Sequence, residues 1–501
     1  MINKSKGQYA DYILKSIKTK KSTYWRKKQI KKSLQLFHLA SDRVPAYKDF
    51  LKKNNINPKK IKTWNDFTRV PMVNKKNYIR KYLLKDLCWD GDLYKPMILT
   101  ATSGSTGEPS YFLRQKNLDW QYSVSIQRFL QNSSYGKNMS TLVIICFGMG
   151  VWIAGIITYK AFELAGFRGN FPLSIITPGI NKKEIFNSLK RLSPQYDQTL
   201  LVGYAPFIKD VIDEAKTEGI NLKKLNIRLG FAAESITEGL RDYMKKHAGV
   251  KNIFTDFFNI YGSADIGAMA FEDTTSILIR RLAINNKDLF KDIFTVTNKT
   301  PTLAQYNPEF INFESLNGEI LLTGDNAIPL IRYSIGDNGN VLTYDEVETI
   351  LTKNKINLMK IANKFKIADK LTELPFVYVY ERQDFSVSLY GLNIYPEWIK
   401  NAIVSTNLGK KLTGKFTMVS RFDKHGDQYL EINTELKKGA KATIDFKRSA
   451  EGIMTNYLAR ASSEYAELLH HLKERAVPKL KYHVSEDPEY FKSGIKHKWV
   501  K

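Results

Sequence analysis

Between residues 96 and 340, short apolar runs alternate with stretches of helical periodicity, and this alternation limits the possible folds more than any other feature. Four mainly apolar runs have the length of buried strands: residues 142–146, 174–177, 200–203 and 227–232. Residues 182–192 and 207–217 lie between these runs and have the pattern of helices. Strands that alternate with helices build largely parallel sheets covered by helices. The pattern therefore predicts an α/β fold, with a strand pair added at residues 318–323 and 329–334.

The C-terminal part of the chain has secondary-structure signals of its own. A chain of 501 residues exceeds one ordinary hydrophobic core, so two or more domains are expected. The tail offers three strands and one long helix, at residues 416–419, 429–434, 479–484 and 441–458. These elements are enough for a small α+β domain. We predict a large domain at residues 1–381 and a small one at residues 382–501.

One uncharged stretch, residues 138–159, approaches the ~20 residues that a membrane-spanning helix needs. Gly148 and Gly150 interrupt it, so a buried strand, a glycine turn and a buried helix explain it as well. The chain has no second stretch of this kind, and we expect no stable membrane insertion. Residues 3–37 mix basic and apolar residues, which predicts amphipathic helices, with a membrane-surface helix as the alternative.

The chain is strongly basic. Its 77 lysines and arginines against 50 acidic residues give a net charge of +27, which suits an anionic partner. The lysines are spread over the chain, and this favours a solvated surface over specific nucleic-acid binding. Cys88 and Cys146 cannot build a disulfide framework or a cysteine metal site. Together with the lack of an apolar leader in residues 1–21, they predict a cytoplasmic protein.

Six consecutive small residues form the most distinctive loop of the chain: Thr102, Ser103, Gly104, Ser105, Thr106 and Gly107. The loop lies between apolar runs at 96–99 and 111–113, so we expect it to connect two strands. Its N–H and hydroxyl groups can surround an anion. No lysine follows Gly107, unlike in the glycine-rich loop that opens a helix. Taken alone, the loop also suits a flexible surface turn.

Four further motifs follow the loop in a fixed order. They are residues 230–234 (GFAAE), 261–265 (YGSAD), 331–337 (IRYSIGD), and 382–385 (RQDF) with 391–396 (GLNIYP). In this order and spacing they resemble the acyl-adenylate-forming superfamily, and specifically its phenylacetate–CoA ligase-like branch. That branch includes capsule-biosynthesis relatives and a deazaflavin-adenylating relative. Residues 44–47 with 67–76 resemble its N-terminal signature, and the resemblance covers nearly the whole chain.

The resemblance implies that these motifs bind ATP. The loop 102–107 would surround the β- and γ-phosphates, and Tyr261 would stack on the adenine. Asp337 would accept both ribose hydroxyls, since one carboxylate offers two oxygens to two donors. The other residues that the resemblance places at the nucleotide are Ala232, Ala233, Glu234, Gly262, Ser263 and Arg382.

The resemblance also implies roles in catalysis. Asp265 stands where the family usually has a glutamate that binds Mg²⁺, and its side chain is one methylene shorter. The lysine that stabilises the forming acyl phosphate is implied at Lys496, with Lys498 as the alternative. Asp384 would be the hinge about which a small mobile domain rotates. The substrate pocket would contain Phe147, Trp152 and Tyr204, although aromatic residues of this kind also suit a core.

The function that the resemblance implies is that of an enzyme. It would be an ATP- and Mg²⁺-dependent ligase that converts a small carboxylic acid to an acyl-AMP and passes the acyl group to coenzyme A. Two alternatives stay open: transfer to another acceptor (a sugar amine, a carrier-protein thiol or a cofactor hydroxyl), and a non-catalytic basic binding protein on this scaffold. Residues 271–300 contain no cysteine or histidine, so we expect no zinc. The identity of the acid and the oligomeric state stay open.

Overall fold

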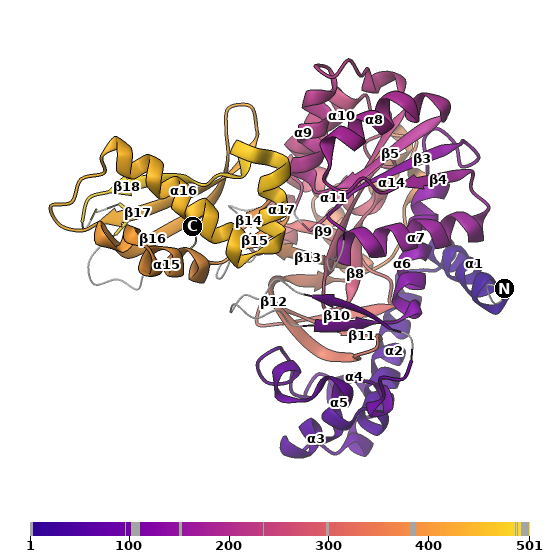
Figure 1. The fold of residues 1–501 in the computed structure, drawn as a ribbon. Helices are drawn as coiled ribbons and strands as arrows, with labels where there is room; N and C mark the ends of the chain where they lie inside the picture. Colours follow the sequence, from indigo (N-terminus) through magenta and orange to yellow (C-terminus); the bar gives the residue numbers. More distant parts are fainter. Residues whose placement is uncertain are drawn as a thin grey trace.

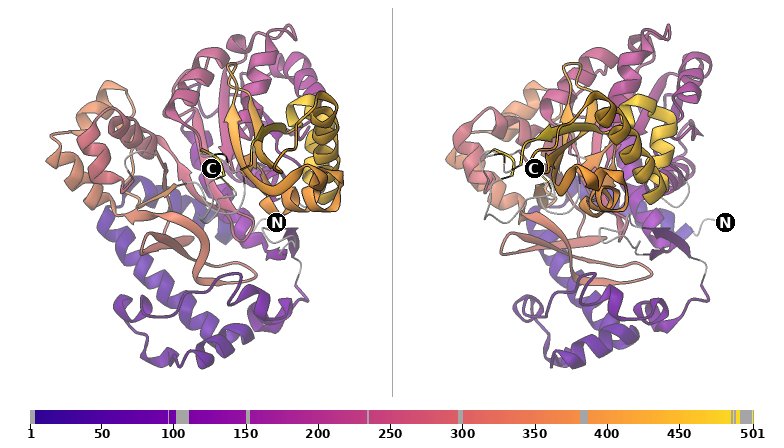
Figure 2. Two further views of the ribbon diagram at one scale, coloured as in Figure 1. Left: turned by 90° about the vertical axis from the view of Figure 1, so that its left-hand side faces the viewer. Right: turned by 60° about the vertical axis from the view of Figure 1, so that its left-hand side comes forward.

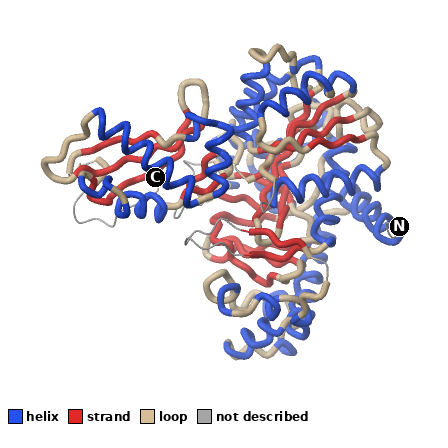
Figure 3. The backbone as a smooth tube through the Cα atoms, viewed as in Figure 1, coloured by secondary structure: helices blue, strands red, loops and turns tan. Residues whose placement is uncertain are grey.

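The computed structural model of the chain describes residues 4–95, 97–101, 111–149, 153–233, 235–296, 300–380, 387–485, 487, 489–491 and 500. A large N-terminal part is built around one sheet of eleven strands, and a smaller C-terminal part has a sheet of its own (Figure 1). Helices cover both faces of the large sheet (Figure 3). The predicted α/β class is confirmed.

The large sheet has two halves that differ in strand direction. Its order is β10-β11-β12-β13-β9-β8-β7-β6-β5-β3-β4. The strands from β4 to β7 pair in parallel, whereas those from β7 to β10 pair antiparallel. The bounds are β3 Thr141–Cys146, β4 Leu173–Ile176, β5 Gln198–Gly203, β6 Ile227–Ala232, β7 Phe257–Ser263, β8 Gly267–Glu272, β9 Thr302–Gln305, β10 Ile311–Leu316, β11 Glu319–Gly324, β12 Leu330–Leu342 and β13 Phe376–Tyr380. The predicted strand pair at 318–323 and 329–334 is β11 and β12.

The parallel half of the sheet is buried on both faces. Along β3, Leu142 and Ile144 belong to one hydrophobic core, and Val143 and Ile145 belong to the other. Successive side chains of a strand point to opposite faces, so a strand between two helical layers is mostly apolar on both faces. This explains the uncharged stretch at 138–159, of which the first part is β3. No helix of the described chain is long and apolar enough to span a bilayer.

The helices around this sheet are seven to seventeen residues long. They are α6 Lys116–Gln131, α7 Ile153–Gly169, α8 Lys182–Arg191, α9 Ala205–Ala215, α10 Glu238–Ala248, α11 Thr274–Ile284, α12 Lys287–Ile293, α13 Tyr344–Lys353 and α14 Leu358–Lys364. Buried residues of α6 and α7 join one core, and those of α8, α9 and α10 join the other. Because helices cover both faces of the sheet, the cleft described below lies at the strand ends.

The basic N-terminal region forms helices that pack on the protein itself. They are α1 Lys4–Thr19, α2 Ser22–Arg43, α3 Pro45–Lys53, α4 Trp64–Phe67 and α5 Leu84–Leu87. The long helix α2 runs along the antiparallel end of the sheet (Figure 2). Its Trp25 and Phe37 are buried, and Lys28 and Lys32 lie 2.6 and 3.3 Å from the carboxylate of Glu309. The apolar face predicted for residues 3–37 thus meets protein, not lipid.

The strands on either side of the loop 102–107 form the predicted hairpin. β1 (Ile98–Ala101) and β2 (Tyr111–Arg114) pair antiparallel. The hydroxyl of Thr100 donates to the carbonyl oxygens of Phe112 at 3.2 Å and Ala264 at 3.5 Å. The hairpin is therefore held beside the segment that follows β7, while the loop itself lies outside the described residues.

The C-terminal part is an α+β unit, drawn in orange and yellow (Figure 1). It contains β14 Val387–Leu389, β15 Leu392–Ile394, α15 Pro396–Ser405, β16 Leu412–Phe422, β17 Gln428–Leu436, α16 Ile444–Ala461, α17 Ser463–Leu472 and β18 Lys479–His483. The strands β16 and β17 are antiparallel, and β18 joins β17 in parallel. The predicted domain boundary at 381/382 falls among residues 381–386, which are outside the described residues, so it stays a prediction.

Short 3₁₀ turns connect many of these elements. They are η1 Pro58–Lys60, η2 Ile79–Lys81, η3 Trp89–Gly91, η4 Ser193–Gln195, η5 Leu222–Lys224, η6 Ala368–Lys370, η7 Asn407–Lys410 and η8 Lys473–Ala476.

One buried ion pair lies where the neighbouring parallel strands β6 and β7 begin. Arg228 on β6 and Asp256 are both fully buried, and their side chains lie 3.1 Å apart. We expect Asp256→Ala to lower the free energy of unfolding by ~3–5 kcal/mol, because it leaves a buried guanidinium without its counter-charge. Urea denaturation measures this change. Glu218→Ala breaks the exposed pair with Lys190 and is the control, with an expected loss of at most ~1 kcal/mol. Equal losses in both variants would contradict the prediction.

Candidate active site

A cleft of about 1050 Å³ lies at the carboxyl ends of the parallel strands. Tyr204 follows β5, Ala232 ends β6, and Tyr261 lies near the end of β7; all three line the cleft. Side chains from the C-terminal unit line its other side. Open α/β sheets bind ligands at this edge.

The structure brings several of the predicted nucleotide residues together. Those that line the cleft are Ala232, Ala233, Tyr261, Gly262, Ser263 and Asp337. The hydroxyl of Tyr261 donates to Oδ2 of Asp337 at 2.6 Å, which joins the end of β7 to the middle of strand β12. A Cβ atom at Gly262 would lie 2.7 Å from the carbonyl oxygen of Gly267, so only glycine fits there.

The hydroxyl of Ser263 is buried and has no hydrogen-bond partner among the described residues. Ser263 lines the cleft and is one of the residues that the sequence places at the nucleotide. Buried polar groups in native structures are usually paired, so an unpaired hydroxyl in a cleft suits a bound ligand. The position fits a donor or acceptor for a polar group of that ligand.

Asp265 is held by two neighbours. Only 2% of this residue is exposed. Its Oδ1 lies 3.2 Å from Nζ of Lys75, and its Oδ2 accepts a hydrogen bond from the hydroxyl of Tyr333 at 2.7 Å. Lys75 belongs to the N-terminal region of the chain. It reaches Asp265 because the nearby residue Val73 pairs with Tyr333 on β12. The carboxylate thus holds a partly exposed lysine at the wall of the cleft.

The predicted role of Asp265 as a ligand of Mg²⁺ stays a prediction. Both of its oxygens already have partners, and Lys75 balances its charge. In the part of the chain that the structure describes, no group of three or more His, Cys, Asp or Glu side chains gathers to hold a metal. Mg²⁺ is usually bound through one or two carboxylates plus substrate phosphates. Lys75 supplies a positive charge beside Asp265 in this arrangement.

The cleft has an apolar end between α6 and α7. It is lined there by Tyr122, Ile153, Ala154, Ile157 and Thr158. The hydroxyls of Tyr122 and Thr158 lie 3.3 Å apart, and burial raises the pKa of Tyr122, so that its hydroxyl stays neutral. This end suits the apolar part of a ligand better than a charged one.

The three predicted substrate-pocket aromatics have different places. Tyr204 lines the cleft. Phe147 is fully buried and packs edge-on behind Tyr204, with ring centroids 5.1 Å apart, and it is not among the residues that line the cleft. Trp152 lies outside the described residues. Phe147 therefore supports the wall of the cleft from behind.

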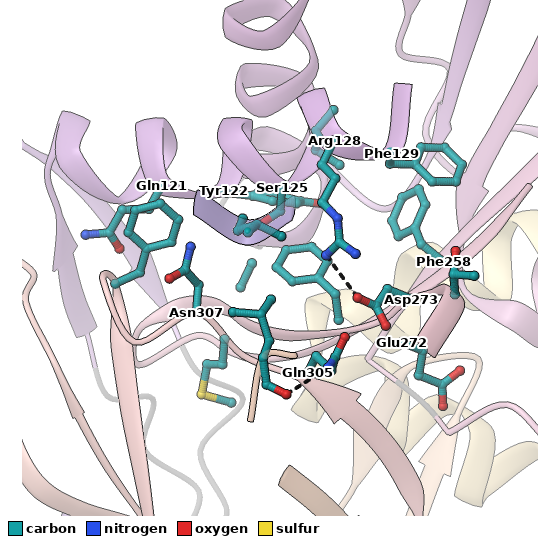
Figure 4. Close-up of a pocket in the computed structure, with 18 of the residues that line it drawn as sticks. Gln121, Tyr122, Ser125, Arg128, Phe129, Phe258, Glu272, Asp273, Gln305 and Asn307 are labelled. Atoms are coloured by element: carbon teal, nitrogen blue, oxygen red, sulfur yellow. Dashed lines mark hydrogen bonds and ion pairs between the residues drawn. The ribbon is translucent and has the colours of Figure 1, made fainter. Parts of the chain in front are cut away.

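A second cavity of about 70 Å³ lies behind the apolar end (Figure 4). Tyr122 and Ala268 line both the cleft and this cavity, so they form part of the wall between them. In Figure 4 Arg128 points from α6 to Asp273, and Phe129 lies against Phe258. Arg128 pairs with Asp273 at 2.9 Å, which closes one side.

Other predicted site residues lie outside the described residues: Thr102, Ser103, Gly104, Ser105, Thr106, Gly107, Glu234, Arg382, Asp384, Lys496 and Lys498. Their neighbours are described. Val500 follows the lysine segment, pairs with Met418 on β16 and lines the cleft. The hairpin that carries the loop 102–107 lies beside Asp265, since Nζ of Lys75 is 5.7 Å from the ring centroid of Phe112. The roles predicted for these residues stay predictions.

The sequence gives no separate signal for Lys75, Tyr333 or Tyr122. Lys75 belongs to residues 67–76, which resemble the N-terminal signature, but so does Lys76 beside it. Tyr333 belongs to the motif that ends in Asp337. Only the fold shows that Lys75 and Tyr333 meet at Asp265.

Comparison with known proteins finds coenzyme A ligases that are similar to this chain. No profile of a known protein family matches the chain. The phenylacetate–coenzyme A ligase of Thermus thermophilus is 20% identical over 458 residues, which cover 88% of this chain and 86% of that one. A solved structure of 2-hydroxyisobutyryl-CoA ligase with 2-HIB-AMP and CoA has a TM-score of 0.59 at 14% identity and covers 96% of this chain and 89% of that one. The same ligase in the postadenylation state has a TM-score of 0.51 at 15% identity, with 97% and 91% covered.

The chain has the acyl-adenylate-forming fold. The match extends over both the large and the small part, as the sequence resemblance does. The phenylacetate–CoA ligase-like resemblance that the motifs predict is confirmed. Within this adenylate-forming scaffold, the residues around Tyr261 and Asp337 occupy the main cleft.

The Lys75–Asp265 pair gives a testable prediction about ATP. We expect Lys75→Met to weaken ATP binding by about 10- to 100-fold, because a charge-assisted contact contributes roughly 1.5–3 kcal/mol. Calorimetric titration with ATP measures the change. The exposed neighbour Lys76 provides the control, and Lys76→Met should bind ATP as the wild type does.

The substitution Lys75→Met leaves the buried Asp265 without its counter-charge, so the stability of the fold has to be measured as well. We expect the double variant Lys75→Met/Asp265→Asn to recover the wild-type melting temperature and still to bind ATP weakly. Normal ATP binding by the double variant would contradict a role for Lys75 at the nucleotide.

Proposed function

We propose that this protein is an ATP-dependent ligase that activates a carboxylic acid as an acyl-AMP and then forms an acyl-CoA thioester. The observation that carries the proposal is the hydrogen bond of 2.6 Å from the hydroxyl of Tyr261 to Oδ2 of Asp337. Both residues line the main cleft of an acyl-adenylate-forming fold. Similarity to phenylacetate–coenzyme A ligase and to 2-hydroxyisobutyryl-CoA ligase supports the same function.

The first half-reaction joins two anions. A carboxylate oxygen of the acid attacks the α-phosphorus of ATP, the bond to the β-phosphate oxygen breaks, and pyrophosphate leaves. The protein has to hold the two reactants in line and to offset their negative charge. Asp337 would accept the ribose hydroxyls, and the hydrogen bond from Tyr261 orients its carboxylate. Lys75 is the described cation on the wall of the cleft beside Asp265.

The second half-reaction needs a thiol. The sulfur attacks the acyl carbon, the bond to the phosphate oxygen of AMP breaks, and the thioester and AMP are released. We propose coenzyme A as the thiol, since the neighbouring ligase structure holds 2-HIB-AMP and CoA together. Mg²⁺ is proposed as the cation that accompanies the phosphates of ATP, with Asp265 as its proposed ligand in this chain. The loop 102–107 and Lys496 or Lys498 are proposed for the phosphates and the forming acyl phosphate.

A panel of carboxylic acids tests the function directly. With ATP and Mg²⁺, we expect pyrophosphate release with at least one apolar acid, and release of AMP and a thioester only when coenzyme A is added. Mass spectrometry of the product identifies the acceptor. The variant Asp337→Ala should raise the KM for ATP by at least ~10-fold, since it removes two charge-assisted bonds. The exposed Asp345 offers the control Asp345→Ala, which should act as wild type. No pyrophosphate with any acid would refute the proposal.

The wall formed by Tyr122 gives a prediction about the size of the acid. Tyr122→Ala should join the cleft to the 70 Å³ cavity and shift the preference toward acids that are longer by a few carbon atoms. The ratio kcat/KM for a homologous series of acids measures this shift. Tyr122→Phe keeps the ring and loses the hydroxyl that faces Thr158, so it should keep the wild-type order of preference. An unchanged order in Tyr122→Ala would place the acid elsewhere in the cleft.

A further inference from the structure

Helix α9 buries charged residues at its junction with the C-terminal unit. Lys209 is 3% exposed and Asp210 is 0% exposed. Charged side chains are almost never buried to this degree without partners. Burial raises the pKa of Asp210 to about 6, against the opposing effect of Lys182 and Arg475. The two residues therefore lie at a closed interface.

Their partners lie on the C-terminal unit. Nη1 of Arg475, in η8, lies 2.7 Å from Oδ2 of Asp210, and its Nη2 lies 2.7 Å from Oδ2 of Asp427. Lys209 donates to the carbonyl oxygen of His425 at 2.8 Å and to Oδ1 of Asp427 at 3.2 Å. Lys209, Asp427, Arg475 and Asp210 thus form, in this order, a chain of three ion pairs with alternating charge, here called the interdomain latch.

Two glycines bring the surfaces into direct contact at this junction. Gly426, in the turn between β16 and β17, has a φ of +78°, and a Cβ atom there would lie 2.8 Å from Cε of Lys209. Gly391, between β14 and β15, has a φ of +82°, and a Cβ atom there would lie 2.2 Å from the ring of Tyr204. The latch therefore closes next to Tyr204, a wall of the cleft.

The latch can open without leaving a charge unpaired. Lys209 has a second partner on its own helix, Asp213 at 2.5 Å, and Asp210 has Lys182 at 3.9 Å. On the other side, Arg475 and Asp427 have each other. The pair Arg228–Asp256 differs because it is buried inside the large part. Separating its two side chains would leave each charge buried, without a partner and without water.

From these contacts we infer that Lys209, Asp210, Asp427 and Arg475 are positioning residues that set the orientation of the C-terminal unit over the cleft. The inference rests on the proposed two-step function. When the latch is closed, it holds the C-terminal unit in the orientation seen here and favours the half-reaction that uses this orientation. The other half-reaction requires the latch to open. Weakening the latch should therefore change the two half-reaction rates in opposite directions.

Labelled protein measures the orientation itself. Cys88 and Cys146 are buried, so labels attach at two exposed positions, introduced as Phe167→Cys on α7 and Ile444→Cys at the start of α16. Single-molecule energy transfer should give one main population for the wild-type latch. Arg475→Gln and Asp427→Asn should each move a large part of the molecules to a second population. Lys190→Gln, which breaks an ion pair within the large part, is the matched control and should change nothing.

Kinetics on the full-length variants measure the consequence. ATP–pyrophosphate exchange reports adenylation, and consumption of supplied acyl-AMP with coenzyme A reports transfer. We expect each latch variant to change the ratio of the two rates by about ten-fold, one rate rising and the other falling. The double variant Arg475→Gln/Asp427→Asn should show less than the sum of the two single effects, because the two residues share one interaction. Asp427→Asn is an isosteric change in the turn between β16 and β17, so it carries the test if Arg475→Gln fails to fold.

The outcomes separate this inference from the proposed function. Unchanged populations and an unchanged ratio, in an enzyme that adenylates an acid, would overturn the latch and leave the function standing. A parallel fall of both rates with unchanged populations would also overturn it, since that is the effect of a purely structural ion pair. Shifted populations without adenylation of any acid would support the orienting role and overturn the proposed function.

Discussion

The burial of the parallel strands on both faces is the constraint on which the rest of the structure depends. Strands such as β3, with Leu142 and Ile144 in one core and Val143 and Ile145 in the other, have no face left for polar chemistry. Polar side chains can then gather only where the strands end. Tyr204, Ala232 and Tyr261 follow or end neighbouring strands, and this is why one edge of the sheet carries the cleft.

Two kinds of ion pair result from this arrangement. Arg228 and Asp256 are enclosed by the sheet and its helices and serve stability. Lys75 and Asp265 lie at the wall of the cleft, where the lysine is 28% exposed and can face a ligand. The latch around Asp210 lies between the two parts of the chain and can exchange its partners. The surroundings of each pair, more than its chemistry, decide whether it stabilises, binds or moves.

The sequence predicts the large elements well, because their signals are local. Strand β6 has the predicted bounds 227–232, and α8 differs from its prediction by one residue, because apolar runs and helical periodicity depend on near neighbours. The meeting of Tyr261 with Asp337 follows from motif order. Lys75 is different: its role depends on the pairing of Val73 with Tyr333, which no local pattern encodes. Phe147 and Tyr204 are both aromatic residues that follow an apolar run. Only their packing shows that Tyr204 lines the cleft and covers Phe147.

The latch shows the limit of sequence reasoning most clearly. Lys209, Asp210 and Asp213 have the spacing of a solvated helix face, and nothing near them in sequence indicates a partner. The burial of Lys209 and Asp210 follows from the turn around Gly426 and from Arg475, which the chain supplies only after the large sheet is complete. A ligase that adenylates and then transfers has to exclude water from one cleft in both steps. A junction of paired charges, which re-pair within each part on separation, lets such a cleft close firmly and still reopen.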